Sequence, residues 1–530
     1  GTKIRELLST GNFNRLVVAG PSPIPYEPRF QRYAEQAGLN RYLLEMVNLH
    51  NQCARVHSSN RAEATEKAKI LMRMGLARAR QLEPLDDLEF MVTQSCLVVG
   101  GSASGVACAA KLAKMGIHVH LVEGAPGLEI VPGNNHHLVA PLLADLSTDN
   151  KVEIHAPATV NEVQGFVGNF KVELVQRGAK MAVEVGAIVV ATNDRGTIGT
   201  GFEKSLALAK DKNGFYLSTQ GILNLLDFTT EGVFNCGLAR ATLEIEDAVI
   251  DGEAAASRVA TVLASPMMVK APVISHVVEE NCDGCAYCVE PCPTRTITLL
   301  EFMQRGEIKK VVEVNEATCI GCGICMATCP KKGIFVRHFK PEYFSAMVAA
   351  ALKENDKQPV TPLDEITSQD KRPLEKLSNG VTPLDYRPLH ATGSQGTLSN
   401  GVILSFCCNR CAYPGADAAG SAGIQYPTSV KIIRTVCTGM IHPNIIIDAL
   451  THGADGVLLC GCHPGNCRSR EGIRKAQSRA ESIALMLEDF GLEPERFRLE
   501  FIAASEGSKF AKVVAEMTEA LSALGPNPYR

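Results

Sequence analysis

The sequence predicts an α/β protein in which two parallel-sheet regions flank a smaller α+β module. Strand and helix signals alternate over residues 91–265 and begin again at Gly401, which is typical of parallel sheets with crossover helices. Between these regions, cysteines recur at short and regular spacings. At 530 residues the chain exceeds what one hydrophobic core usually serves, so we expect several domains.

Composition narrows the class of protein. The formal net charge is -4 and the sequence contains no basic block, which argues against nucleic acid as a partner. We find no apolar run long enough to span a membrane and no apolar segment typical of a leader at the N-terminus, so we expect a cytoplasmic location. In a reducing compartment the 19 cysteines favour metal ligation over disulfides.

The elements follow in order along the chain. Residues 1–90 predict an N-terminal α/β domain, with the strand RLVVAG and helices in RFQRYAEQAGL and ATEKAKILMRMGLARARQL. Over residues 91–269, the strands SCLVVG, HVHLVE, AIVVAT and GVFNCG alternate with the helix ACAAKLAKMG and an alanine-rich helix near 247–264. Residues 270–340 form the cysteine module, 341–399 a helix and a polar linker, and 400–530 the second parallel unit.

A glycine-rich turn follows the first strand of the 91–269 region. Gly100 and Gly105 take the outer positions of a G-x-G-x-x-G fingerprint, and Glu123 ends the next strand, where a ribose-binding acid belongs. Ser102 weakens the fingerprint because its Cβ reduces the room for a pyrophosphate. We predict a Rossmann-like FAD/NAD(P)-binding-type domain, with any FAD near Gly100, Gly101, Ser102, Gly105, Glu123 and Gly237. The alanine-rich helix after Gly237 is also compatible with plain packing.

The cysteine module contains two consecutive C-x2-C-x2-C-x3-C-P runs. Such spacing lets three thiolates hold one [4Fe-4S] cluster while the fourth reaches the other cluster. We therefore predict a two-cluster ferredoxin domain. One cluster would be bound by Cys282, Cys285, Cys288 and Cys329, and the other by Cys319, Cys322, Cys325 and Cys292. Zinc is the alternative, but zinc sites need neither a third cysteine in each run nor the trailing proline.

Seven further cysteines follow predicted strands of the C-terminal unit, in FCCNRC, IIRTVC and VLLCGCHPGNC. The carboxyl ends of parallel strands meet at one sheet edge, so these thiols should converge there. We predict a [2Fe-2S] cluster held by Cys407, Cys411, Cys437 and Cys462, with Cys408 and Cys467 as alternatives. Cys460 is interpreted as a buried apolar residue, which is common for cysteine.

These segments resemble known families. RFQRYAEQAGLNRYLLEMVNLHNQC, EVQGFVGNFKVEL, the double cysteine run and KKGIFVRHFKPE are similar to the A-type subunit of heterodisulfide reductase. FCCNRCAYPGADAAG, GADGVLLCGCHPGNC and LEFIAASEGSKFAKVVAEM resemble the delta subunit of methyl-viologen-reducing hydrogenase. Fused arrangements of this sort also resemble the B-type subunit of the quinone-interacting oxidoreductase of sulphate reducers.

The resemblance implies an electron-transfer subunit of a heterodisulfide reductase-like complex. Electrons would enter the [2Fe-2S] cluster from a hydrogenase, formate dehydrogenase or F420-oxidising subunit, then pass through two [4Fe-4S] clusters to a flavin or to a partner. Implied partners are an intact A-type subunit and B/C-type subunits. The alternatives are a self-sufficient flavin oxidoreductase and a scaffold paralogue that docks an input module. The chain departs from the A-type pattern at 134–137, where Asn-Asn-His-His replaces a cysteine pair, and at Pro21. The histidine pair could bind a metal or be solvated.

Overall fold

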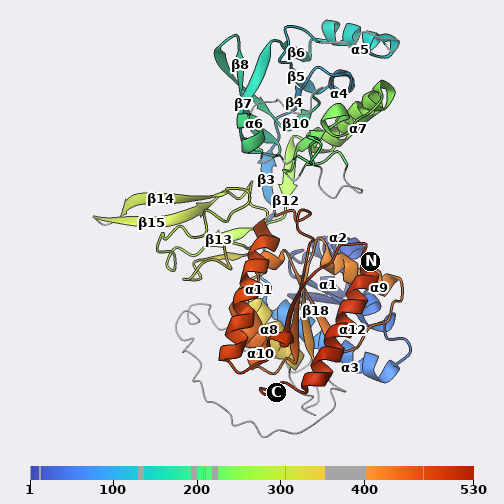
Figure 1. The fold of residues 1–530 in the computed structure, drawn as a ribbon, viewed down its shortest axis with the longest axis vertical. Helices are drawn as coiled ribbons and strands as arrows, with labels where there is room; N and C mark the ends of the chain where they lie inside the picture. The colour runs from blue at the N-terminus through green and yellow to red at the C-terminus, as the bar shows by residue number, and fades with distance from the viewer. Residues whose placement is uncertain are drawn as a thin grey trace.

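The computed structural model describes residues 2–10, 13–128, 136–192, 200–206, 208, 210–217, 225–228, 230–304, 306–352, 401–469 and 471–530. The expected linker at 354–399 and residues Asn134 and Asn135 lie outside these ranges. One domain stands apart at the top of Figure 1, while the N-terminal, ferredoxin-like and C-terminal parts pack together below it. The α/β fold class is confirmed, and no described helix has the length and apolarity needed to cross a bilayer.

The N-terminal part consists of helices around a two-stranded parallel sheet. Its elements are α1 (Thr2–Ser9), β1 (Leu16–Gly20), α2 (Pro23–Gln36), β2 (Leu44–Asn48), the π-helix η1 (His50–Ala54) and α3 (Arg61–Gln81). Local sequence explains the start of α3, because the Asn60 side chain accepts a hydrogen bond from the Glu63 amide. The side-chain amides of Asn48 and Asn51 both donate to Asp417 of the C-terminal unit at 2.8 Å. The first and last parts of the chain therefore share one interface.

The upper domain contains a five-stranded parallel sheet with the strand order β11-β10-β4-β5-β6. Helix α4 and helix α7 cover one face, and an antiparallel sheet of β7, β8 and β9 covers the other. The bounds are β4 (Ser95–Val99), α4 (Ala103–Lys114), β5 (His118–Val122), α5 (His136–Thr148), β6 (Val152–His155), β7 (Ala158–Phe166), β8 (Asn169–Gln176), β9 (Ala179–Val185), β10 (Ala187–Val190), α6 (Thr200–Ser205), β11 (Val233–Asn235), η2 (Gly237–Ala239) and α7 (Ile245–Leu263). This is the layered arrangement that the alternating strand and helix signals predict.

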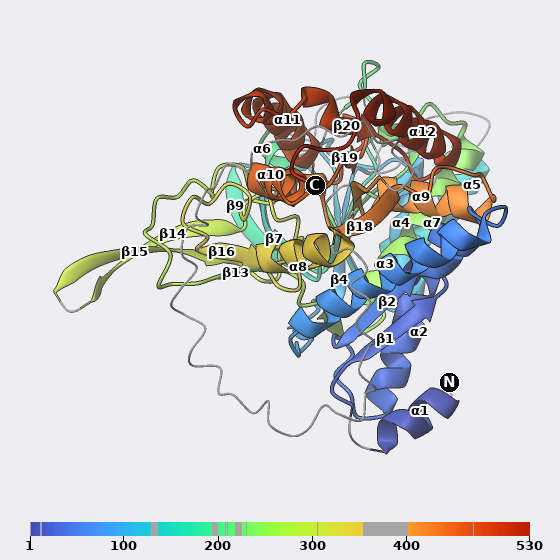
Figure 2. The same cartoon turned by 90° about the horizontal axis from the view of Figure 1, so that it is seen from below.

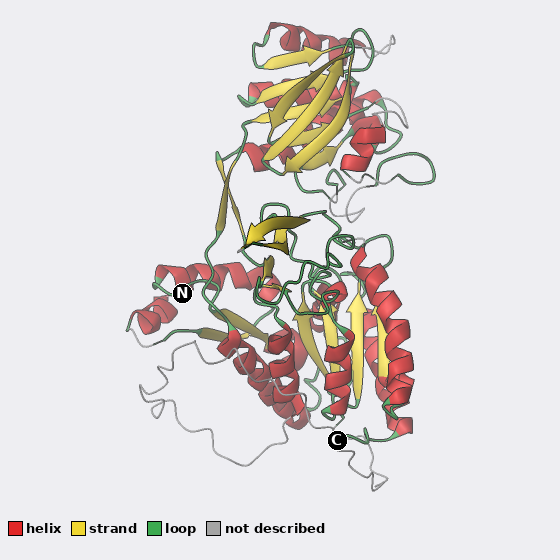
Figure 3. Cartoon of the chain, turned by 90° about the vertical axis from the view of Figure 1, so that its left-hand side faces the viewer, coloured by secondary structure: helices red, strands yellow, loops and turns green. Residues whose placement is uncertain are grey.

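Two antiparallel strands join the upper domain to the rest of the molecule. Strand β3 (Leu88–Met91) enters the domain, and strand β12 (Met267–Lys270) returns from it. They lie side by side between the domain and the lower parts in Figures 1 and 3. We call this pair the connecting ribbon.

The cysteine module is built from short strands and loops. Strand β13 (Ser275–Val277) pairs with β16 (Ile334–Val336), and β14 (Ile297–Gln304) pairs with β15 (Glu307–Val314) as a long hairpin. The hairpin projects away from the body in Figures 1 and 2. Helix α8 (Pro341–Leu352) then packs against α3.

The C-terminal unit is a four-stranded parallel sheet with the order β18-β17-β19-β20. Separate apolar clusters lie on the two sides of this sheet, and both contain cysteines. Its elements are β17 (Ile403–Cys408), α9 (Ala412–Ser421), β18 (Val430–Thr435), η5 (Thr438–Met440), α10 (Pro443–Thr451), β19 (Gly456–Gly461), α11 (Glu471–Asp489), η6 (Pro494–Arg496), β20 (Phe497–Phe501) and α12 (Gly507–Leu524).

Candidate metal centres and dinucleotide site

The eight cysteines of the module form two groups in space. The thiols of Cys329, Cys282 and Cys285 surround that of Cys288, and burial together with these neighbours raises the pKa of Cys288 to about 11. Cys329 comes from the second cysteine run, so the two runs exchange their fourth members. This arrangement matches the expected ligand set for the first cluster.

The second group repeats the pattern around Cys322. Its thiol is buried beside those of Cys325, Cys319 and Cys292, and burial raises its pKa above the ordinary value. Cys292 is the member supplied by the first run. Tight turns make the grouping possible. Gly321 adopts φ +64°, and a Cβ there would lie 2.3 Å from the carbonyl oxygen of Val273.

Hydrogen-bond donors face several of these sulphur atoms. The Ser275 amide donates to Cys319 Sγ at 3.4 Å, and the Ser275 hydroxyl lies 3.2 Å from Cys325 Sγ. The amide of Gly333 donates to Cys329 Sγ at 3.3 Å. Such bonds stabilise the negative charge of thiolates and tune the reduction potential of a cluster that they hold.

Five cysteines converge at the carboxyl edge of the C-terminal sheet. The sulphur atoms of Cys408 and Cys462 are 3.7 Å apart, and Cys462 also contacts the thiols of Cys411 and Cys467. Hydrogen bonds from Cys437 and Cys462 lower the pKa of Cys467, which favours the thiolate. These residues come from three different strand ends, as the parallel topology predicts.

The structure places Cys407 away from this group, which argues against our sequence assignment. Cys407 and Cys408 are consecutive in β17, so their side chains point to opposite faces of the sheet. Cys407 Sγ lies 3.3 Å from the hydroxyl of Ser405 and packs with Cys460 in the other apolar cluster. The thiol beside Cys462 is that of Cys408. The alternation of side chains between the two faces of a strand is the sequence signal that could have distinguished Cys408 from Cys407.

The two cysteine-rich regions meet at one point. Cys437, Cys322 and Ile324 pack together as a small apolar cluster. A Cβ on Gly323 would lie 2.5 Å from Cβ of Met440, which shows how closely the two backbones approach. Arg479 on α11 spans the contact, because it donates to the carbonyls of Gly439 and Ala327 at 2.6 and 3.1 Å. Sequence reasoning missed Arg479.

The glycine turn of the upper domain has the geometry of a dinucleotide cradle. Gly100 adopts φ +112°, and a Cβ there would lie 2.4 Å from the carbonyl oxygen of Ala191. A Cβ on Gly105 would lie 2.1 Å from the carbonyl oxygen of Gly100. Glu123 accepts hydrogen bonds from the amides of Gly101 and Ala125 at 2.6 and 3.0 Å. The acid therefore lies against the turn, as the fingerprint requires.

Ser102 fits this turn in a way that the sequence did not reveal. Its hydroxyl points inward, where it accepts a hydrogen bond from the Gly105 amide at 3.1 Å and donates to the Ala191 carbonyl at 2.6 Å. It caps α4, as serine often does at helix starts. Gly237 lies beside the same helix, because a Cβ there would meet the hydroxyl of Ser104 at 2.1 Å. These residues fit the phosphate-bearing part of a dinucleotide.

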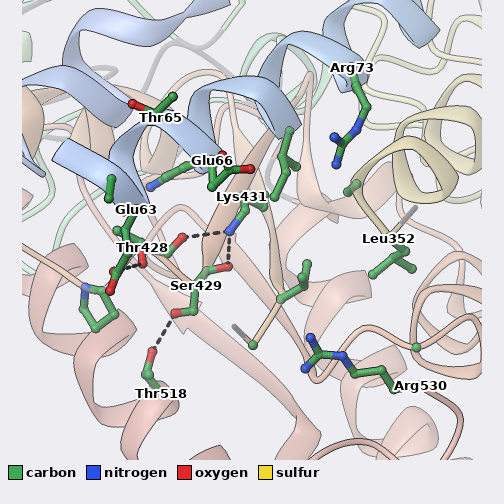
Figure 4. A pocket seen from close by; sticks show the side chains of 18 of the residues that line it. Glu63, Thr65, Glu66, Arg73, Leu352, Thr428, Ser429, Lys431, Thr518 and Arg530 are labelled. Carbon is green, nitrogen blue, oxygen red and sulfur yellow. Dashed lines mark hydrogen bonds between the residues drawn. The ribbon is translucent and has the colours of Figure 1, made fainter. Parts of the chain in front are cut away.

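A pocket of about 1040 Å³ lies between α3, the end of α8 and β18. Figure 4 shows Lys431 at its wall, with Nζ donating to the carbonyls of Thr428 and Ser429 at 2.7 and 2.9 Å. Burial lowers the pKa of Lys431 to about 8. Among the described residues that line this pocket none is a cysteine, so it is separate from the thiol groups.

Comparisons with known families match three parts of the chain. Residues 403–525 match the methyl-viologen-reducing hydrogenase delta subunit family. Residues 46–237 match the pyridine nucleotide-disulphide oxidoreductase family, and residues 281–333 match the 4Fe-4S dicluster domain. The order of these matches along the chain agrees with the arrangement seen in the structure.

Two relatives illustrate the similarity. The A-type subunit of the ferredoxin:CoB-CoM heterodisulfide reductase of Methanosarcina mazei is 23% identical, over 98% of this chain and 91% of the relative. The iron-sulfur D-type subunit of the F420-non-reducing hydrogenase of Archaeoglobus profundus is 47% identical over 124 residues, which are 23% of this chain and 90% of the relative.

Proposed function

We propose a route for electrons through this chain, which is a homologue of the heterodisulfide reductase A-type subunit. Its C-terminal part belongs to the hydrogenase delta-subunit family. The chain is an electron-transfer subunit of an oxidoreductase. In the proposed route, electrons enter at the C-terminal thiol group, continue through the ferredoxin-like module, and leave to a flavin or to a partner subunit.

The observation that carries the proposal is the contact between Cys437 and Cys322. Each belongs to one of the thiol groups, and both are buried with Ile324 in one apolar cluster. When bound, iron–sulphur clusters supply one-electron carriers at these groups. The protein holds the two groups against each other in this buried contact, and Arg479 fixes the backbones on both sides.

We propose that the C-terminal centre is a [2Fe-2S] cluster bound by Cys408 and Cys462, whose sulphur atoms lie together, and by two of Cys411, Cys437 and Cys467. This revises the set inferred from sequence by removing Cys407. The ferredoxin-like module would hold two [4Fe-4S] clusters, with the ligand sets inferred from sequence. The support is the grouping of the thiols in space.

The upper domain is of the flavin type, and we propose that it binds FAD at Gly100, Gly101, Ser102, Gly105, Glu123 and Gly237. Its cysteines Cys96, Cys108 and Cys236 are completely buried, and burial raises the pKa of each thiol. Inert thiols of this kind are unsuited to disulfide exchange. A self-sufficient disulfide-reducing flavoenzyme is therefore not favoured.

The relatives' names support membership of a larger complex. We propose that an electron-input subunit, either a hydrogenase, a formate dehydrogenase or an F420-oxidising subunit, contacts the C-terminal unit. An intact A-type subunit and B/C-type subunits would receive the electrons. A purely docking protein has no need of three grouped sets of thiols, so their presence supports electron transfer over a scaffold role.

The test compares two adjacent cysteines in the anaerobically purified chain. Cys408→Ser should remove the [2Fe-2S] electron paramagnetic resonance signal and leave the signals of the [4Fe-4S] clusters. Cys407→Ser is the matched control and should leave all signals intact, because that thiol faces the other side of the sheet. A loss of the signal in Cys407→Ser but not in Cys408→Ser would refute the assignment.

A further inference from the structure

A second set of metal-ligating side chains lies in the upper domain, apart from every cysteine group. His120 is on β5, while Glu153 and His155 are on the neighbouring strand β6. Their ligand atoms all lie within 4.8 Å of one another. None of the three belongs to the dinucleotide turn or to the thiol groups described above.

Strand register explains why these side chains meet. Strands β5 and β6 are parallel, with His120 paired to Glu153 and Val122 paired to His155. Paired residues of a parallel sheet point to the same face, as do residues two positions apart on one strand. His120, Glu153 and His155 therefore project from one face at the edge of the sheet.

The distances between the atoms resemble the edges of a metal coordination polyhedron. His120 Nδ1 lies 3.3 Å from His155 Nε2 and 3.4 Å from Glu153 Oε2. Ligands of a tetrahedral zinc ion with bonds of about 2.0 to 2.1 Å are roughly 3.3 to 3.4 Å apart. The remaining pair, His155 Nε2 and Glu153 Oε2, is 3.9 Å apart. Because the Glu153 side chain is 53% exposed, its carboxylate can rotate to shorten this distance.

We infer that His120, Glu153 and His155 form a binding site for a divalent transition metal ion such as zinc. Two imidazoles and one carboxylate form a donor set that suits zinc and its first-row neighbours better than calcium or magnesium. The two histidines are largely buried, while Glu153 is exposed, so the fourth coordination position opens to solvent.

The site would stabilise the part of the domain that presents the dinucleotide turn. Strand β6 is the last strand of its sheet, and a metal would fix it to β5 through side chains as well as backbone. The carbonyl of His155 accepts a hydrogen bond from the amide of Glu123 at 3.0 Å. A ligand that binds only the folded state raises its stability by mass action. Metal binding should therefore raise the unfolding temperature of this domain.

The experiment uses the full chain with its iron–sulphur clusters assembled, so that the cluster thiols are occupied. The protein is treated with a chelator that leaves the clusters intact, exposed to zinc chloride, and passed through a desalting column. We expect about one zinc per chain to be retained. Zinc-edge X-ray absorption should show nitrogen and oxygen neighbours at about 2.0 to 2.1 Å; a shell of sulphur at about 2.3 Å would overturn the inference.

Variants on the same strands make the test specific. His120→Gln and Glu153→Gln should lose the retained zinc and the zinc-dependent rise in unfolding temperature. His118→Gln is the matched control, because His118 lies on the same strand and face but does not belong to the group whose ligand atoms all lie within 4.8 Å of one another. It should retain zinc. Retention in all three variants, or loss in His118→Gln alone, would overturn the site. Because Glu153 is exposed, Glu153→Gln decides the question even if His120→Gln fails to fold.

Discussion

Replacing Arg479 by methionine should loosen the contact between the ferredoxin-like module and the C-terminal unit. The guanidinium donates to the carbonyl of Gly439 at 2.6 Å, to the carbonyl of Ala327 at 3.1 Å and to the hydroxyl of Thr328 at 3.3 Å. Arg479 is half-buried, and this burial lowers the pKa of its guanidinium. Methionine retains an apolar stem like that of arginine but cannot donate a hydrogen bond.

The magnitude follows from the partners left behind. A buried acceptor without a donor costs about 1 to 3 kcal/mol, and two carbonyls lose their donor here. We expect the free energy of opening this interface to fall by about 3 kcal/mol. Because about 1.4 kcal/mol corresponds to a factor of ten, amide hydrogen exchange near the contact should become roughly 100-fold faster. The amides of Met440 and Cys329 are suitable probes, since both are hydrogen-bonded within the contacting loops.

Arg474→Met is the matched control on the same helix. Arg474 is 68% exposed and pairs with Glu471 one turn away, and such surface pairs contribute at most about 1 kcal/mol. Exchange at the contact should be unchanged in this variant. Equal exchange rates in Arg479→Met and the unmodified protein would refute the view that Arg479 holds the two thiol groups together.

Three other predictions test the dinucleotide turn, a buried lysine and the hydroxyl beside a proposed cluster ligand. Gly105→Ala should abolish the binding of FAD to the purified chain, since the added Cβ would lie 2.1 Å from the carbonyl oxygen of Gly100. Gly124→Ala is the control and should retain FAD, because a Cβ at that position would meet nothing within 4 Å. The pKa of Lys431 is lowered to about 8 by burial, so the unfolded chain binds more protons above that pH. The contribution of Lys431 to the free energy of unfolding should therefore rise by about 3 kcal/mol between pH 8 and 10.5. Denaturant titrations of the unmodified protein and of Lys431→Met should show that their difference in free energy of unfolding changes by this amount over the same pH range. A difference that stays constant with pH would contradict the prediction. Ser275→Ala should lower the reduction potential of the [4Fe-4S] cluster that we propose Cys325 binds, as followed by redox titration. Thr318→Ala, which removes a hydroxyl bonded to a carbonyl, should leave this potential unchanged.

The sequence was most informative where chemistry depends on local spacing. The α/β class was predictable because short apolar strands such as Ser95–Val99 alternate along the chain with helices such as Ala103–Lys114. The grouping of Cys329 with the first cysteine run follows from the spacing alone. Both features can be predicted from residues that are near one another in the chain or from a spacing that repeats.

Features that depend on the packing of distant segments were not predictable. Arg479 meets Ala327 across 152 residues, and nothing in the surrounding helix marks it as an interface residue. The β7, β8 and β9 sheet was also missed, although Gly168, with φ +89°, lies in the turn between two strands whose buried and exposed residues largely alternate. The sequence assignment preferred Cys407 to Cys408, although successive side chains of a strand point to opposite faces of the sheet. In the structure Cys408, and not Cys407, lies on the same face as the other grouped cysteines.

The connecting ribbon brings the two chain ends of the flavin-type domain to one point of the host. The chain leaves the host at Leu88 and returns at Lys270, and these residues are Cα partners across the ribbon. Antiparallel partners are only about 4.5 to 5.5 Å apart, so the host backbone could be closed there by a short turn. Removal of the domain at the ribbon would therefore leave a continuous backbone path through the N-terminal part, the cysteine module and the C-terminal unit.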